Sequence, residues 1–176
     1  MRWEVLTADA EKRALAQALV AISAKRGWGV AVLRSAAAST CADAEAWRRH
    51  FPRGSVDAIW FISEVSDASM ALAFDGRPAS CVANVIGERL EQNSDLKPFV
   101  FRVMVFDMLH PFQAVARMQR TAQVMRRCLA PAAKAPGTTP LNWTYTFIVF
   151  VWLCDGTRDD ALTMRLNRWL MRCIGG

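Results

Sequence analysis

The stretch Phe51-Pro52-Arg53-Gly54-Ser55-Val56-Asp57 decides how the chain is divided into helices. A proline and a glycine two positions apart interrupt the helical pattern that precedes them. Ser55 is a favourable N-cap residue, and Asp57 in the first turn complements the positive end of a helix. The stretch therefore predicts a corner followed by a long helix that runs to about Phe74.

The residues before this corner predict three further helices. Leu15, Leu19 and Ile22 recur at i, i+4 and i+7, which places them on one face of a first helix from about Ala8 to Arg26. Gly27 ends that helix. Two short helices follow, near Val30–Ala38 and Asp43–His50.

Five more helices are predicted after residue 76. The valines and phenylalanines of Phe99–Leu109 also suit a strand, but no neighbouring segment is able to pair with one, so we predict a buried helix. The next helix begins at Pro111 and carries an apolar stripe from Val115 to Leu129. Ala130–Pro140 is predicted to be a loop inside the domain. The other three helices are Pro78–Gln92, Leu141–Asp155 and Asp159–Ile174.

Length and composition predict one all-α domain of about nine helices, because 176 residues fit a single domain. The longest apolar run, Phe147 to Cys154, is shorter than the roughly 18 residues that a bilayer crossing requires. The cysteines are scattered and form no C-x-x-C pair, which argues against a disulfide framework or a zinc site. We expect them to be small buried hydrophobic residues in a reducing compartment.

The net charge of +6 is concentrated late in the chain, because residues 101–135 carry six positive charges and one negative charge. Such a basic surface suits nucleic acid, phospholipid or an acidic protein. Arg117, Arg120 and Arg127 share one face of their helix, opposite the apolar stripe. They form either a solvated face or a contact site for an anionic membrane or an acidic partner.

The last helix carries an apolar stripe and a basic stripe on different sides. Arg165, Arg168 and Arg172 are predicted to point outward and to form a second contact site for a membrane or partner. Trp169 is expected to anchor the helix in the core. The apolar stripe that we expect to face the domain consists of Leu162, Leu166, Trp169 and Cys173.

The sequence carries no recognisable catalytic or metal-binding constellation. Its two histidines, His50 and His110, lie 60 positions apart, whereas acid–base catalysis and metal binding usually need a close cluster. No G-x-S-x-G, P-loop or H-E-x-x-H motif is present. We therefore predict a protein that is not an enzyme and has no catalytic residue, metal site or cofactor.

Two segments before the long helix resemble a helix-turn-helix of the TetR type. They are Lys25-Arg26-Gly27-Trp28-Gly29 and Ala46-Trp47-Arg48-Arg49-His50-Phe51-Pro52. The resemblance implies that residues 1–60 form this part and residues 61–176 a C-terminal bundle. Asp43 and Glu45 lie near the start of the helix that would enter the major groove, where carboxylates repel phosphate. We therefore predict a packing module that does not bind nucleic acid.

Further motifs resemble the TetR-like, lipid-binding Coq-nine family of ubiquinone-biosynthesis accessory proteins. The corner stretch is similar to the family's FPRG-x-VD segment, and the order and spacing of the matches extend over about 160 residues. The other matches are Ile86-Gly87-Glu88-Arg89-Leu90-Glu91, Leu109-His110-Pro111, Arg120-Thr121-Ala122, Asn142-Trp143 and Trp152-Leu153 with Asp155.

The resemblance implies a protein that holds isoprenoid lipid in an apolar cavity and presents a quinone precursor to a di-iron hydroxylase at the membrane. The cavity is expected between the helices Phe99–Leu109 and Leu141–Asp155, although the same side chains would also suit a filled core. The implied location is the mitochondrial matrix at the inner membrane, or the cytoplasm of a bacterium. The residues expected to bind lipid are Phe101, Met104, Met108, Trp143, Phe147 and Phe150.

Departures from the family pattern leave two other functions open. Basic residues that follow the family's Asn-Trp pair are absent from Thr144-Tyr145-Thr146-Phe147, and Gln123 and Arg126 stand where the family has Asp and Trp. The partner surface is thus altered while the scaffold is retained. One alternative is a structural accessory subunit of a larger mitochondrial assembly, and the other is a TetR-type transcriptional regulator. By analogy with TetR-like bundles, a homodimer through the last two helices is a further possibility.

Overall fold

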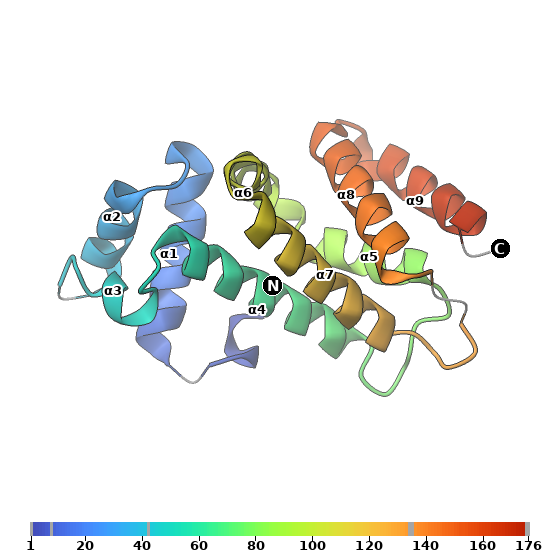
Figure 1. Ribbon diagram of the computed structural model, residues 1–176, viewed down its shortest axis with the longest axis horizontal. Helices are drawn as coiled ribbons and strands as arrows, with labels where there is room; N and C mark the ends of the chain where they lie inside the picture. Colours follow the sequence, from blue (N-terminus) through green and yellow to red (C-terminus); the bar gives the residue numbers. More distant parts are fainter. Residues whose placement is uncertain (1, 8, 42, 134–135, 175–176) are drawn as a thin grey trace.

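The computed structural model describes residues 2–7, 9–41, 43–133 and 136–174. Within them the chain forms nine α-helices and no β-strand, which confirms the all-α prediction. Figure 1 shows α1 to α3 at one end of an elongated molecule, α8 and α9 at the other, and α4 running between them. The helices are α1 (Ala10–Arg26), α2 (Val30–Thr40), α3 (Trp47–His50), α4 (Ser55–Ala73), α5 (Val82–Gln92), α6 (Lys97–Leu109), α7 (Pro111–Arg127), α8 (Thr138–Cys154) and α9 (Ala161–Ile174).

The predicted corner lies between α3 and α4, but its cap differs from the prediction. The N-cap residue of α4 is Gly54, with φ of 66°, and not Ser55. A Cβ atom at Gly54 would make an ordinary contact with Leu33 Cδ1 at 3.4 Å, so it is the positive φ that favours glycine here. The carboxylate of Asp57 accepts a hydrogen bond from the backbone N–H of Arg53 at 2.7 Å, which ties the corner to the first turn of the helix.

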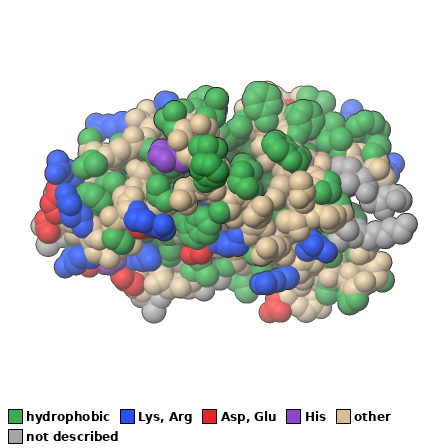
Figure 2. Space-filling model, in the orientation of Figure 1, with side chains coloured by type: hydrophobic (Ala, Val, Ile, Leu, Met, Phe, Trp, Pro, Cys, Tyr) green, Lys and Arg blue, Asp and Glu red, His purple; other side chains and the backbone are tan. Residues whose placement is uncertain are grey.

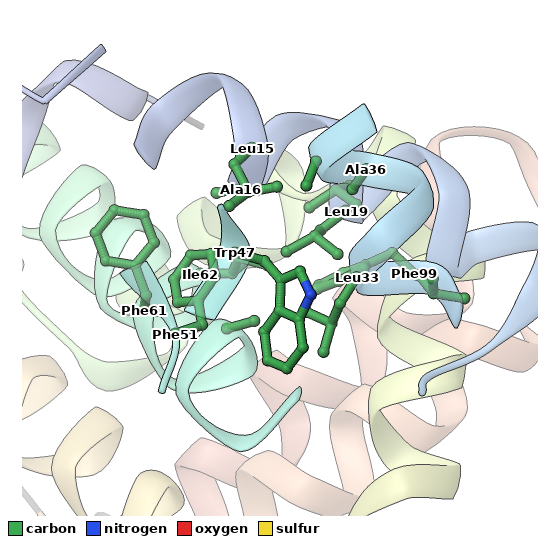
Figure 3. Close-up of a cluster of buried hydrophobic side chains, with 14 of the residues drawn as sticks. Leu15, Ala16, Leu19, Leu33, Ala36, Trp47, Phe51, Phe61, Ile62 and Phe99 are labelled. Atoms are coloured by element: carbon green, nitrogen blue, oxygen red, sulfur yellow. The ribbon is translucent and has the colours of Figure 1, made fainter. Parts of the chain in front are cut away.

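The helices at the N-terminal end enclose one apolar core (Figure 3). Trp47 begins α3 and Phe51 begins the corner. Both side chains are buried and lie among side chains of α1, α2 and α4. Phe99 of α6 joins the same cluster, so the C-terminal bundle contributes to this core. Helix α4 passes from this core into a second one, where Met70 packs among side chains of α5, α7, α8 and α9. The boundary predicted near residue 60 therefore falls inside α4.

Two helices are shorter than predicted because polar backbone interactions replace helical ones. Helix α3 begins at Trp47 and not at Asp43, since Asp43 accepts the backbone N–H of Glu45 in a local turn. Helix α5 begins at Val82 and not at Pro78. The backbone of Ala79 instead bonds to Cys128 O at 2.8 Å and to the N–H of Ala130 at 2.9 Å. The predicted start of α1 at Ala8 lies outside the described residues.

Helix α6 is not the buried helix that was predicted. Only Phe99 and Asp107 are buried in it, because the helix packs mainly on α1, touches α7 and α8 less, and leaves the rest of its surface uncovered. Its exposed apolar side chains are Phe101, Val105, Met108 and Leu109. The prediction of buried cysteines was also wrong in part, since Cys128 is buried, Cys41 is half-buried and Cys81, Cys154 and Cys173 are exposed.

Helix α9 is rotated relative to the prediction. Leu162 and Trp169 are exposed, as is Cys173, whereas Thr163, Asn167 and Met171 are buried. Two polar contacts explain this rotation. Asp155 accepts bonds from both N–H and Oγ1 of Thr163, at 2.8 and 2.7 Å, and Asn167 Nδ2 donates to Ala83 O at 2.8 Å. The prediction that the three arginines of α9 point outward is confirmed.

The carboxylate of Asp155 holds the first turn of α9, because it accepts hydrogen bonds from Thr157 and Thr163. Burial by itself raises its pKa, but bonds donated by the side chains and backbone of Thr157 and Thr163 outweigh burial and hold the pKa of Asp155 well below its usual range. The ionised form is therefore the one that fixes α9.

We expect Trp152→Ala to lower the free energy of unfolding by about 3–5 kcal/mol, because it empties a buried site. The Trp152 side chain is buried, and its Nε1 donates to Asp160 at 2.8 Å. Trp169→Ala is the matched control and should change stability by less than about 1 kcal/mol, since that side chain is 58% exposed. Urea unfolding followed by circular dichroism measures both, and equal losses would contradict the rotation of α9 described above.

Candidate functional site

The polar centre of the bundle is the carboxylate of Asp67 on α4. It pairs with Arg89 of α5 and, at 2.8 Å, with Arg120 of α7. Thr121 of α7 donates to both of its oxygens at 3.1 Å. Asp67 is 2% exposed, so three helices are joined by charge-assisted bonds that water does not screen.

Arg89 extends this network to α8, because its Nε donates to the hydroxyl of Tyr145 at 2.7 Å. Burial alone lowers the pKa of Arg89, but the nearby charge of Asp67 and the bond to Tyr145 outweigh it and raise that pKa above its usual range. The guanidinium is thus permanently charged, and it needs the carboxylate of Asp67 beside it.

Two of the three arginines predicted on the outer face of α7 are structural. Arg117 is buried and pairs with Asp107 of α6. Burial raises the pKa of Asp107, and Arg117 offsets this only in part. Arg120 is half-buried between Glu64 and Asp67. Only Arg127 is exposed as predicted, because Arg117 and Arg120 find carboxylate partners on α6 and α4 and Arg127 has none among the described residues.

An open groove of about 530 Å³ lies beside the Asp67 network. It is bounded by the N-terminal segment, α4 and α7, and carries the exposed Arg127 at its edge. The groove is not the predicted cavity, which was expected between α6 and α8. Its walls mix apolar side chains such as Phe74 and Val124 with the acidic Glu64 and Asp75.

The residues predicted to bind lipid lie on the surface and do not enclose a cavity. Figure 2 shows hydrophobic side chains over α6 and over α8, with a notch between them at the upper edge of the molecule. Met104 is the exception, because it is half-buried and packs against the second core. The exposed residues are Phe101 and Met108 of α6 and Trp143, Phe147 and Phe150 of α8.

The arginines of the helix-turn-helix-like part are largely paired with acids. Glu45 pairs with Arg48 at 2.7 Å and with Arg34, and these two hydrogen bonds lower the pKa of Glu45. Arg49 pairs with Glu11 at 3.0 Å. A surface whose cations already have carboxylate partners attracts phosphate weakly, and the absence of nucleic-acid binding stays a prediction.

Sequence reasoning missed the Asp67 network, although one signal was available. Asp67 follows Ile59 by eight positions and precedes Met70 by three, a spacing that places a carboxylate on the buried face of α4. Buried carboxylates need cationic partners, and Arg89 and Arg120 were available because each lies in a motif identified from the sequence, Ile86–Glu91 and Arg120-Thr121-Ala122. Among the described residues, no group of three or more His, Cys, Asp or Glu side chains is placed to hold a metal ion.

We expect Asp67→Asn to lower the free energy of unfolding by about 3–5 kcal/mol, because it leaves the buried Arg89 without a counter-charge. Glu64→Gln is the matched control, since Glu64 also contacts Arg120 but is 38% exposed, and should cost less than about 1 kcal/mol. Denaturant titration of both variants decides between them. The double variant Asp67→Asn/Arg89→Met should regain most of the loss, and its failure to do so would contradict the charge argument.

Comparison with known proteins supports the fold. No protein-family model matches the chain, and no curated protein matches it. Among solved structures, the chain is similar to the TetR transcriptional regulator from Nitrosomonas europaea, with a TM-score of 0.73 over 94% of this chain and 98% of the regulator. The two sequences are 18% identical, a level at which similarity shows the fold alone. The chain therefore has a TetR-like all-α fold.

Proposed function

We propose that this chain is a non-enzymatic accessory protein of ubiquinone biosynthesis that binds an isoprenoid lipid or quinone precursor in the open notch between α6 and α8. The observation that carries the proposal is the exposure of large apolar side chains on the two helices that border the notch, α6 and α8. Phe101 is 52% exposed on α6, and Trp143 and Phe147 are 74% and 51% exposed on α8. Contiguous apolar surface of this kind is uncommon on soluble proteins and marks a binding surface.

The chemistry of the notch suits an isoprenoid chain. Such a chain is flexible and apolar, and it gains about 25 cal/mol for each Å² removed from water. Aromatic rings provide wide, rigid contact area on which it can lie. Because the notch is open along one side, the bound lipid stays accessible to a partner, as presentation of a quinone precursor to a membrane-bound hydroxylase requires. We place the protein at the mitochondrial inner membrane on its matrix side, or in the cytoplasm of a bacterium.

The motifs that resemble the Coq-nine family support the proposal, because their residues meet in the Asp67 network. Arg89 of the RLE motif and Arg120 and Thr121 of the RTA motif meet at Asp67. The matched residues thus hold the scaffold together, which explains how the scaffold is kept while the partner surface is altered.

A structural accessory subunit of a larger mitochondrial assembly is the second candidate. Met108, Leu109 and Phe112 are 75% to 89% exposed at the bend between α6 and α7, more apolar surface than one lipid chain in the notch needs. A regulator is the third candidate, favoured by the solved neighbour, and a gel shift on duplex DNA at low salt tests it. Sub-micromolar binding that weakens steeply with salt would favour the regulator.

We expect a soluble decyl-tailed ubiquinone to quench the tryptophan fluorescence of the protein saturably, because Trp143 is exposed on α8, which borders the notch, and quinones accept excitation energy at short range. The variant Phe101→Ser/Phe147→Ser should weaken this binding at least tenfold by removing apolar surface from both sides. Val30→Ser/Leu72→Ser removes exposed apolar residues elsewhere and is the matched control. Quenching that does not saturate, or that both double variants weaken equally, would rule out the notch as the binding site.

A further inference from the structure

The outer face of α9 combines basic and apolar side chains. Leu162 and Trp169 are 54% and 58% exposed. Arg165, Arg168 and Arg172 are exposed beside them on the same outer half of the helix. A helix with an apolar stripe next to a basic stripe is typical of segments that lie in the interface of a membrane.

These three arginines lack acidic partners, in contrast to Arg34, Arg48 and Arg49 at the other end of the molecule. Arg168 and Arg172 donate only to carbonyl oxygens one turn earlier in α9, at 3.2 and 3.3 Å. Among the described residues, no ion pair joins any of the three to a carboxylate. Two acids on the neighbouring elements are engaged elsewhere, since Asp160 pairs with Lys97 and Glu88 accepts from Gln92. Glu91 of α5 forms no ion pair with these arginines in the described part of the chain. The basic stripe of α9 is therefore free to meet an external anion.

Helix α8 enlarges this surface with exposed apolar side chains and carries no charged residue. It packs beside α9 (Figure 1), and neither Thr138–Cys154 nor Ala161–Ile174 contains an aspartate or glutamate. Figure 2 shows hydrophobic side chains over both helices, with Lys or Arg side chains at the edge of this region. Trp169 of α9 is exposed, as is Trp143 of α8, and indole rings favour the level of lipid headgroups.

We propose that the α8–α9 face, with Arg165, Arg168, Arg172, Leu162 and Trp169, docks the protein on an anionic lipid bilayer. Phospholipid headgroups supply the negative charge that the arginines lack, and the interfacial region accepts Leu162 and Trp169. A second copy of the chain fits this face less well, because a two-fold interface through α8 and α9 would bring together two sets of arginines without a carboxylate on either helix. The inference goes beyond the proposed function, since docking on a bilayer needs no isoprenoid.

Co-sedimentation with vesicles tests the inference. We use vesicles of phosphatidylcholine alone and vesicles with 30% phosphatidylglycerol, both free of isoprenoid. The protein should bind the anionic vesicles at least tenfold more tightly than the neutral ones, and Arg165→Gln/Arg168→Gln/Arg172→Gln should weaken that binding roughly a hundredfold. Arg48→Gln/Arg49→Gln/Arg53→Gln removes three exposed charges at the opposite end of the molecule and should weaken it less than tenfold.

The apolar part of the surface is tested with Leu162→Ser/Trp169→Ser, which should weaken vesicle binding about tenfold or more while leaving the melting temperature within a few degrees of the wild type. Equal binding to neutral and anionic vesicles, or equal losses in the two arginine variants, would overturn the proposal. A stable dimer in light scattering that Leu162→Ser/Trp169→Ser converts to a monomer would also overturn it, in favour of a second copy on this face. Because the vesicles contain no quinone, vesicle binding tests the α8–α9 face independently of lipid binding in the notch between α6 and α8.

Discussion

Asp67 places one negative charge where four helices of the bundle meet. Arg89 and Arg120 neutralise it, Thr121 completes its hydrogen bonds, and Arg89 carries the network on to Tyr145 of α8. Breaking this buried network leaves a charge without its partner and without access to water. The positions of α4, α5, α7 and α8 therefore depend on each other. The remaining architecture follows, because α4 also extends into the N-terminal core and fixes the corner at Gly54 against α2 and α3.

The polar centre of the bundle leaves the outer surface as the place where an apolar ligand can bind. The charged side chains of the Asp67 network share the space among α4, α5 and α7 with the second apolar core. Several bulky apolar residues of α6 and α8 are exposed, namely Phe101, Val105, Met108, Leu109, Trp143, Phe147 and Phe150. The apolar surface of this protein is therefore open, along the notch between α6 and α8 and over the outer side of α8 and α9. None of the helices in the described part of the chain is long and apolar enough to cross a membrane. An open apolar surface on a rigid scaffold suits contact with a lipid more than enclosure of one.

Local signals in the sequence predicted the helices well, because capping, breaks and periodicity depend on near neighbours. The corner at residues 51–54 and the outward arginines of α9 are examples. Periodicity did not predict which side of a helix is covered. Helix α9 has an apolar stripe through Leu162 and Trp169, yet the bonds from Thr163 to Asp155 and from Asn167 to Ala83 turn that stripe outward. Arg117 and Arg120 were predicted to face solvent, a membrane or an acidic partner. Their actual partners lie on other helices, and sequence spacing within one helix does not reveal them.

Photo-crosslinking with a diazirine-bearing isoprenoid, followed by mass spectrometry of the labelled peptides, tests the central claim most directly. Binding in the notch predicts saturable labelling of peptides from α6 and α8 that contain Phe101, Trp143 and Phe147, and competition by an unlabelled isoprenoid quinone. Labelling concentrated on the groove beside Phe74 and Val124, or spread over the surface without competition, would contradict it.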